Sequence, residues 1–430
     1  MRKLTFLAIL AVAVLIFACG KDDVVNIPEE IQVNLHPNDN VVVFYGDTVQ
    51  FSAQVFNTHD TRVAWAINGI DGGNDSLGTV DTLGKYIAPA SAPSFDQVML
   101  KAISQADTSK SDSATILILD PIYVYVDSAT GDDDLGSGSP VRPYRTITEG
   151  LRHVVSGQTV QLAAGTYTEG EAFPISPNYG ITIRGDGPAT TRVEAPASTS
   201  NDQAAFMIQY DKNYLRDLTI RGSSGLGVGV NFASNIDTST FALSNCRIEG
   251  CYRAVVKTGQ AEILSIVGTA SDTITISGCT YGVIADAVTD TIKIYYTRFE
   301  SIDSTAVDLM AAVDELDFEY NLVDDVRTAI KIGAGGFALV LKNTFMNITD
   351  IGVLIAQDAY ANLGEEQSLL HGDNHFENFG GSWCIWNDDN DTITAKYNWW
   401  PAADSAGIDS LIYDDEENSG SGPVDFYPWN

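Results

Sequence analysis

The segment Ala329-Ile330-Lys331-Ile332 decides the fold, because similar short motifs recur along the C-terminal half of the chain. The other copies are Ala306-Val307-Asp308-Leu309, Gly352-Val353-Leu354-Ile355 and Cys384-Ile385-Trp386. From Val307, the successive steps to Ile330, Val353 and Ile385 are 23, 23 and 32 residues. A repeat in the twenties indicates a solenoid, and short runs that alternate apolar with polar residues indicate strands. The pattern predicts an all-β chain with a right-handed parallel β-helix, one coil per repeat.

A second motif precedes the first and begins with an asparagine in most copies. The asparagines stand at positions 245, 321, 343, 374 and 398. Asparagine tolerates left-handed turns, and stacked amides can hydrogen-bond along a fibre-like axis. We therefore expect these asparagines to stack at one corner of successive coils.

Composition narrows the function classes. The chain has 430 residues, is 44% hydrophobic and 19% charged, and carries a net charge of −33. That charge disfavours nucleic acid, and it would slow an acidic polysaccharide unless cations bridge the two. An alternative reading is solubility in a salty or calcium-containing exterior.

The N-terminus has the pattern of an export signal. Arg2 and Lys3 precede the apolar run from Leu4 to Ala18, which is too short to span a membrane stably. The run ends in Ala18-Cys19-Gly20, which resembles a bacterial lipoprotein cleavage box. The resemblance implies a signal peptide over residues 1–18, lipidation of Cys19, membrane attachment through that anchor and an outer-membrane or cell-surface location. Residues 19–30 then form a tether.

Residues 31–119 show short alternating runs separated by turn signals, which predict a β-sandwich. The string Trp65-Ala66-Ile67-Asn68-Gly69, followed by Gly84-Lys85-Tyr86, resembles the Ig-like modules of bacterial surface proteins. No pair of cysteines is available to bridge two sheets here, so Trp65 would centre the core alone. The resemblance implies a spacer, or less commonly a glycan-binding module.

Residues 120–430 form the third part. Its opening contains Tyr125-Val126-Asp127, Arg142-Pro143-Tyr144-Arg145 and Ala164-Gly165-Thr166-Tyr167. These strings resemble the opening segment of a family of unknown function within the pectate-lyase-like β-helix superfamily. A solenoid needs a capping element at each open end, and apolar residues at helical spacing over 148–155 predict a short capping helix.

Candidate site residues follow from the β-helix register. The residue after each inward apolar position should face outward, which aligns Asp308, Lys331 and Trp386 along one face. Asp286 and Asp388 fall in the next outward column. A sugar ring could stack on Trp386 while charged groups take its hydroxyls. In a lyase, Lys331 would be the base and Asp308 its partner. The alternative is an ion pair on a solvated face.

Metal and thiol chemistry have weaker signals. Asp132, Asp133 and Asp134 resemble a calcium loop in composition, so Ca²⁺ is a possible cofactor. His371 and His375 are the only closely spaced histidines, and a plain turn is the alternative to metal binding. The remaining cysteines, Cys246, Cys251, Cys279 and Cys384, match no zinc or redox motif. We expect buried thiols, with Cys279 within one coil of Cys246 or Cys251.

The sequence thus predicts a monomeric, lipid-anchored surface protein that contacts extracellular or cell-surface carbohydrate without turnover. One alternative is a polysaccharide lyase, or less readily a hydrolase, acting on an acidic glycan. Another is a structural or adhesive protein that recognises protein. The 32-residue step exceeds the 23-residue steps by nine residues, which predicts a loop at Tyr360–Gln367 that borders the face of Asp308, Lys331 and Trp386.

Overall fold

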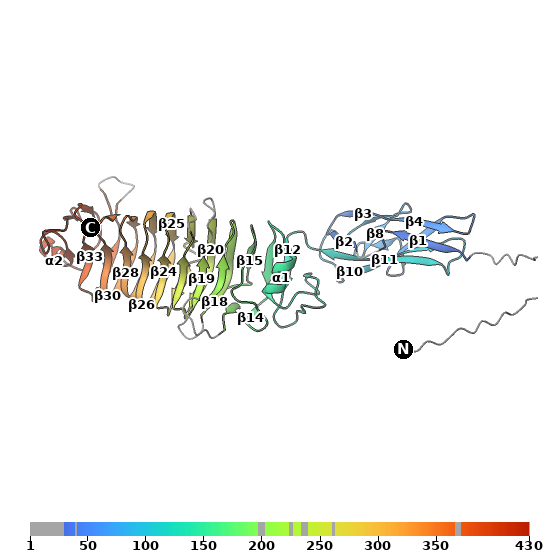
Figure 1. Cartoon of the computed structure of the whole chain (residues 1–430), viewed down its shortest axis with the longest axis horizontal. Coiled ribbons are helices and arrows are strands. Elements are labelled where there is room, and N and C mark those ends of the chain that lie inside the picture. Colours follow the sequence, from blue (N-terminus) through green and yellow to red (C-terminus); the bar gives the residue numbers. More distant parts are fainter. Residues whose placement is uncertain are drawn as a thin grey trace, which may run out of the picture.

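A computed structural model describes residues 30–38, 41–196, 203–222, 227–233, 240–259, 263–365 and 371–429. The predicted signal peptide, Cys19 and nearly all of the tether lie outside the described residues. Figure 1 shows a strand-rich N-terminal part beside a long stack of coils that continues to the C-terminus. The described part of the chain contains no helix with the length and apolar character that a membrane crossing requires.

The N-terminal part is a β-sandwich of short strands. Its core contains Trp65, which is 7% exposed, together with fully buried Phe51, Tyr86, Leu100 and Ile116. One sheet has the strand order β2 (Val41–Phe44), β11 (Ser111–Leu119), β10 (Gln97–Ser104), β5 (Val63–Ile67) and β6 (Ile70–Asp71). A second sheet has the order β3 (Thr48–Gln50), β9 (Lys85–Ile87), β8 (Gly78–Val80) and β7 (Gly73–Asn74). Strand β1 (Gln32–His36) pairs with β4 (Ser52–Phe56). The β-sandwich prediction is confirmed, whereas the Ig-like assignment stays a prediction.

The second part is a parallel β-helix, as predicted. Within the described residues its 25 strands stack in one continuous array. They are β12 (Tyr123–Val126), β13 (Thr159–Leu162), β14 (Gly165–Tyr167), β15 (Thr182–Arg184), β16 (Thr191–Glu194), β17 (Ala204–Ile208), β18 (Asn213–Arg221), β19 (Val228–Phe232), β20 (Thr240–Glu249), β21 (Arg253–Lys257), β22 (Ile263–Val267), β23 (Ile274–Ser277), β24 (Tyr281–Ala285), β25 (Thr289–Tyr295), β26 (Thr297–Leu309), β27 (Val313–Glu319), β28 (Leu322–Ile332), β29 (Phe337–Leu341), β30 (Thr344–Ile355), β31 (Tyr360–Asn362), β32 (His375–Glu377), β33 (Trp383–Asn387), β34 (Ile393–Thr394), β35 (Ile412–Tyr413) and β36 (Val424–Asp425).

The repeat read from the sequence is one coil of this stack. Val307 pairs in parallel with Ile330, Ile330 with Val353, and Val353 with Ile385. All four side chains are fully buried. Alternation along a strand sends successive side chains to opposite faces, so the residue after each of these points away from the core.

A ladder of asparagines holds one corner of the last coils together. The backbone N–H of Asn321 donates to Oδ1 of Asn343 at 2.9 Å, and Asn343 and Asn374 repeat this bond to Asn374 and Asn398 at 3.0 Å. The side-chain Nδ2 atoms follow the same path. Asn245 is an exception to the prediction: it adopts a left-handed φ of 46° and bonds Asp217 instead.

A short helix lies near each end of the β-helix. Helix α1 (Ile147–His153) is N-capped by Thr146 and buries Ile147 and Leu151 at the first coils, close to the predicted 148–155. Helix α2 (Ser405–Asp409) lies near the C-terminus.

The loop prediction at Tyr360–Gln367 is wrong in its position, because β31 (Tyr360–Asn362) pairs with β29 in the wall. The extra residues fall after Leu363 and before Asn374, and residues 366–370 among them lie outside the described residues.

Asp96 clamps the sandwich to the opening of the β-helix. Its carboxylate is 4% exposed and accepts hydrogen bonds from the hydroxyls of Ser137 and Ser139. Nε of Arg142 donates to both of its oxygens, at 2.8 and 2.9 Å. Bonds to an ionised group are stronger than neutral ones. The junction is therefore a specific contact between the two parts.

The four cysteines of the described chain are free and buried. The backbone N–H of Cys251 donates to Sγ of Cys279 at 3.4 Å, so these two residues lie on adjacent coils. The expected proximity of Cys279 to one of its two candidate partners is confirmed. Burial raises the pKa of the Cys246 thiol to about 12.

Candidate functional site

Asp308, Lys331 and Trp386, which are predicted site residues, lie in one outward column of the β-helix. Parallel pairing aligns the column Ile284, Asp308, Lys331, Leu354, Trp386 and Tyr413 on β24, β26, β28, β30, β33 and β35. Adjacent strands lie about 4.8 Å apart. Lys331 and Trp386 are therefore separated by roughly 10 Å, with Leu354 between them.

Asp308 and Lys331 form an ion pair at the surface of this column. Nζ of Lys331 lies 3.7 Å from Oδ1 of Asp308. The distance suits an ion pair but exceeds a hydrogen bond, and Oδ1 has no hydrogen-bond partner among the described residues. The Asp308 side chain is 9% exposed and that of Lys331 is 44% exposed. Burial raises the pKa of Asp308, and Lys331 partly opposes this effect.

An aromatic cluster occupies the end of the same column. The rings of Trp386 and Tyr413 lie 4.5 Å apart between centroids, tilted by 34°. Trp383 meets Tyr413 edge-on at 5.5 Å. All three rings are half-buried. Tyr413 and Trp383 are not among the predicted site residues, although Ile412-Tyr413 repeats the order of Ile385-Trp386, an inward apolar residue followed by an outward aromatic one.

The predicted binding residues Asp286 and Asp388 lie in the neighbouring column but far from each other. The backbone N–H of Asp286 donates to the carbonyl of Lys257, and that of Asp388 to the carbonyl of Ile355, both at 2.9 Å. Met310, Gly333 and Ala356 occupy the coils between them. Four strand spacings separate the two carboxylates by roughly 19 Å. Both are exposed, and the structure does not bring them together.

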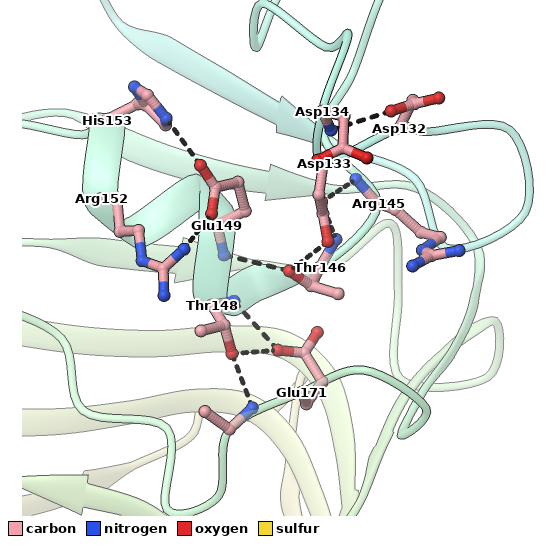
Figure 2. Close-up of polar contacts among 11 residues, drawn as sticks. Asp132, Asp133, Asp134, Arg145, Thr146, Thr148, Glu149, Arg152, His153 and Glu171 are labelled. Carbon is pink, nitrogen blue, oxygen red and sulfur yellow. Dashed lines mark hydrogen bonds and ion pairs between the residues drawn. The ribbon is translucent and has the colours of Figure 1, made fainter.

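The carboxylates of Asp132, Asp133 and Asp134 do not converge on a shared point (Figure 2). Oδ1 of Asp132 accepts the N–H groups of Asp134 and Leu135 at 2.8 and 2.9 Å. Asp133 accepts two backbone N–H groups, from Arg145 and Thr146, and the hydroxyl of Thr146. Its oxygens thus fix the turn that leads into α1.

No group of three or more histidine, cysteine or acidic side chains placed to hold a metal ion occurs in the described ranges. The calcium-binding role of Asp132, Asp133 and Asp134 stays a prediction. The two histidines near position 373 also have separate partners. His371 stacks on Tyr397 at 3.9 Å, and His375 stacks on Trp399 at 5.3 Å.

Solved structures similar to this chain include catalytic domains of GH87 α-1,3-glucanases. One, in complex with tetrasaccharides, is 14% identical over 78% of this chain and 71% of that chain, with a TM-score of 0.35. Another, in complex with nigerose, is 12% identical over 87% of both chains, with a TM-score of 0.27. The thermostable enzyme from Streptomyces thermodiastaticus strain HF3-3 is 12% identical over 85% of this chain and 83% of that one, with a TM-score of 0.26. Likeness at this level carries no argument about activity.

A comparison with curated proteins finds no match. A family model described as "Protein of unknown function (DUF1565)" matches residues 129–403. The match begins shortly after β12 and ends beyond the last asparagine of the ladder, so it covers most of the β-helix and more than half of the chain. The chain belongs to this family of proteins of unknown function, DUF1565.

Proposed function

We propose that the protein is an exported, lipid-anchored surface protein whose β-helix binds carbohydrate without turning it over. The observation that carries the proposal is the pair of rings of Trp386 and Tyr413 on the same outward column as Asp308 and Lys331, with Trp383 packed edge-on against Tyr413. Aromatic rings at a surface offer large apolar faces, and the C–H face of a sugar ring can cover them while its hydroxyls stay hydrated.

The charged pair would supply orientation to such a ligand. Lys331 is sufficiently exposed to meet a hydroxyl or a carboxylate, whereas Oδ1 of Asp308 is buried and would act by holding the ammonium group of Lys331 in place. A ligand that reached from Trp386 to Lys331 would span roughly 10 Å, across Leu354. A few polar groups beside apolar surface are typical of small-molecule sites.

Turnover is the second candidate function, and one observation favours it. The raised pKa of Asp308 beside a lysine is the type of perturbation found at acid–base sites. A lyase would use Lys331 as the base and would need a cation to offset the negative charge of an acidic substrate. Binding is the function we favour, because the rings of Trp386 and Tyr413 offer a stacking surface on the same column.

The cellular location rests on the sequence of residues 1–23. Acyl chains on Cys19 would hold the protein at a membrane surface without a spanning helix. Cys19→Ser should abolish incorporation of labelled fatty acid and release the protein from the membrane fraction or leave it uncleaved. Label that still enters the variant would contradict the anchor.

The glycan proposal is tested on purified residues 24–430 with neutral and anionic glycans, with and without calcium. Binding is measured on an array, and turnover by the appearance of ultraviolet-absorbing unsaturated product. Trp386→Ala should weaken binding at least tenfold. Trp399→Ala is the matched control, because Trp399 is 48% exposed but stacks on His375, outside the column. Equal loss in both variants, or none in either, would contradict the proposed site.

A further inference from the structure

A second concave surface lies on the first coils of the β-helix, on strands other than those of the Trp386 column. It has a volume of about 500 Å³. Six of its lining residues carry the argument: Tyr123, Tyr125, Gln161, Arg184, Asp186 and Asn245. A smaller hollow of about 190 Å³ shares Tyr125, Gln161 and Asp186 with it and extends it around the strand ends. We call the two together the first-coil groove. Its volume is within the range of roughly 300 to 1,000 Å³ that is typical of small-molecule sites.

Strand pairing explains why these residues meet. Tyr125 of β12 pairs with Gln161 of β13, and Gln161 pairs with Arg184 of β15. Their side chains therefore form one outward column at the end of the β-helix next to the sandwich (Figure 1). Tyr123 stands two residues before Tyr125 on the same face of β12, with ring centroids 5.9 Å apart and planes inclined by 53°.

The ring of Tyr125 is held in place by its hydroxyl group. The hydroxyl of Tyr125 donates to Oδ2 of Asp120 at 3.3 Å, and burial beside this carboxylate raises the pKa of Tyr125 to about 12. The phenol is thus neutral and anchored at neutral pH. Both rings are half-buried, which leaves part of each face to a ligand.

Asp217 orients the polar side chains of the groove. Its Oδ2 accepts Nε of Arg184 at 3.0 Å and Nε of Arg216 at 3.1 Å, and its Oδ1 accepts Nδ2 of Asn245 at 2.9 Å. Among the described residues, no acceptor engages the Nη atoms of Arg184. Equally, in that part of the chain no donor engages Oδ1 of Asn245 or the carboxylate of Asp186. The groove therefore presents fixed donors and acceptors with unused capacity.

The lining of the groove is acidic, as is the whole chain with its net charge of −33. The residues that line it include three carboxylates, Asp127, Asp186 and Asp217, and one basic side chain, Arg184. Such a surface repels an anion. It suits a ligand that is uncharged but rich in groups that both donate and accept hydrogen bonds.

From this geometry we propose that the first-coil groove binds a short uncharged oligosaccharide. The vicinal hydroxyls of a pyranose match the two-atom polar ends of carboxylate, amide and guanidinium side chains. Its C–H faces match the tyrosine rings. This site is independent of the Trp386 column, since the two share no strand, and it can exist whether or not that column binds glycan.

The test uses the detergent-solubilised full-length protein, isothermal titration calorimetry and saturation-transfer NMR. The probes are uncharged trisaccharides of glucose, mannose and galactose, with tetragalacturonate as the anionic probe. We expect at least one uncharged trisaccharide to bind. Tyr123→Ala and Asp186→Ala should each weaken that binding at least tenfold without changing the melting temperature by more than a few degrees.

The controls separate this proposal from the proposed function. Tyr214→Ala is the matched aromatic control, because Tyr214 is 43% exposed on the same run of strands but does not line the groove. It should bind as the unmodified protein does. In the Trp386→Ala background, which removes any binding at the Trp386 column, Tyr123→Ala and Asp186→Ala should still each weaken binding of the uncharged trisaccharide at least tenfold. Binding of tetragalacturonate alone, binding of no probe, or loss of binding in Trp386→Ala but not in Tyr123→Ala and Asp186→Ala would overturn the proposal.

Discussion

Removing one member of the asparagine ladder should destabilise the protein far more than its single side chain suggests. Asn343 is fully buried. Its Nδ2 donates to the carbonyl of Phe318 at 2.8 Å and to Oδ1 of Asn374 at 3.0 Å. Its Oδ1 accepts the backbone N–H and the Nδ2 of Asn321 at 2.9 and 3.1 Å. Asn343→Ala deletes all four of these bonds.

The loss in the free energy of unfolding depends on which hydrogen-bond partners of Asn343 keep another bond in the variant. Nδ2 of Asn321 keeps its bond to the carbonyl of Ile294, and Oδ1 of Asn374 keeps the backbone N–H of residue 343. The N–H of Asn321 and the carbonyl of Phe318 lose the bonds that this side chain gave them. A buried polar group left unsatisfied costs about 1–3 kcal/mol. Two such groups give an expected loss of about 2–6 kcal/mol in the free energy of unfolding.

The assay is urea unfolding followed by far-ultraviolet circular dichroism and by tryptophan fluorescence. A solenoid can unfold in segments, so agreement between the two probes has to be established first. Asn390→Ala is the control, because Asn390 is exposed and its removal should change stability by less than about 0.5 kcal/mol. If Asn343→Ala costs no more than Asn390→Ala, the ladder bonds do not hold the coils together and the reasoning is refuted.

Three further predictions follow from buried polar and thiol groups. Asp96→Ala should loosen the junction, seen as faster proteolysis between Leu119 and Tyr123 and a broader small-angle scattering distribution; an unchanged scattering profile would contradict the clamp. The raised pKa of Asp308 means that the native state binds its proton more tightly than the unfolded state does, so its contribution to stability falls as pH rises. Asp308→Asn should therefore gain stability relative to the unmodified protein at pH 7, a gain that disappears below the usual carboxyl pKa range; a gain independent of pH would refute this. The buried thiols of Cys246 and Cys384 should resist a thiol reagent until urea unfolds the protein, and rapid labelling of the native protein would show that they are accessible.

The β-helix could be predicted from the sequence because its repeat is local and its alternation is strict. Val307, Ile330 and Val353 recur at one interval, and a slip of one residue would turn each inward side chain to solvent. The same alternation predicts that Asp308 lies beside Lys331, and the two residues pair on adjacent strands. The ladder prediction is wrong for Asn245. Each asparagine of the ladder directly follows a residue with positive φ, whereas Asn245 is itself the residue with positive φ. Aligning short motifs cannot detect this offset of one residue.

The candidate sites were less accessible to sequence reasoning, for a physical reason. Asp133 and Asp134 look alike in the sequence, yet the first accepts three hydrogen bonds and the second accepts none from described residues. The first-coil groove depends on Tyr125, Gln161 and Arg184, which belong to successive strands with unequal spacing. No period marks them, because the first coils carry long excursions between strands.

The two proposed binding surfaces differ in residue type because, in a solenoid, the side chains that stabilise the coils point inward and a separate set of side chains faces solvent. The inward columns must stay apolar along the whole axis, since each coil packs only on its neighbours. The outward columns have no such constraint, so acid, cation and aromatic residues can change from coil to coil at little cost to stability. Substitution of Lys331 or Asp186 should therefore alter binding with little effect on folding. By contrast, any polar residue on an inward position needs a buried partner, as Asn387 finds in the carbonyl of Gly422. Exposed columns are where differences of function between members of this family can accumulate.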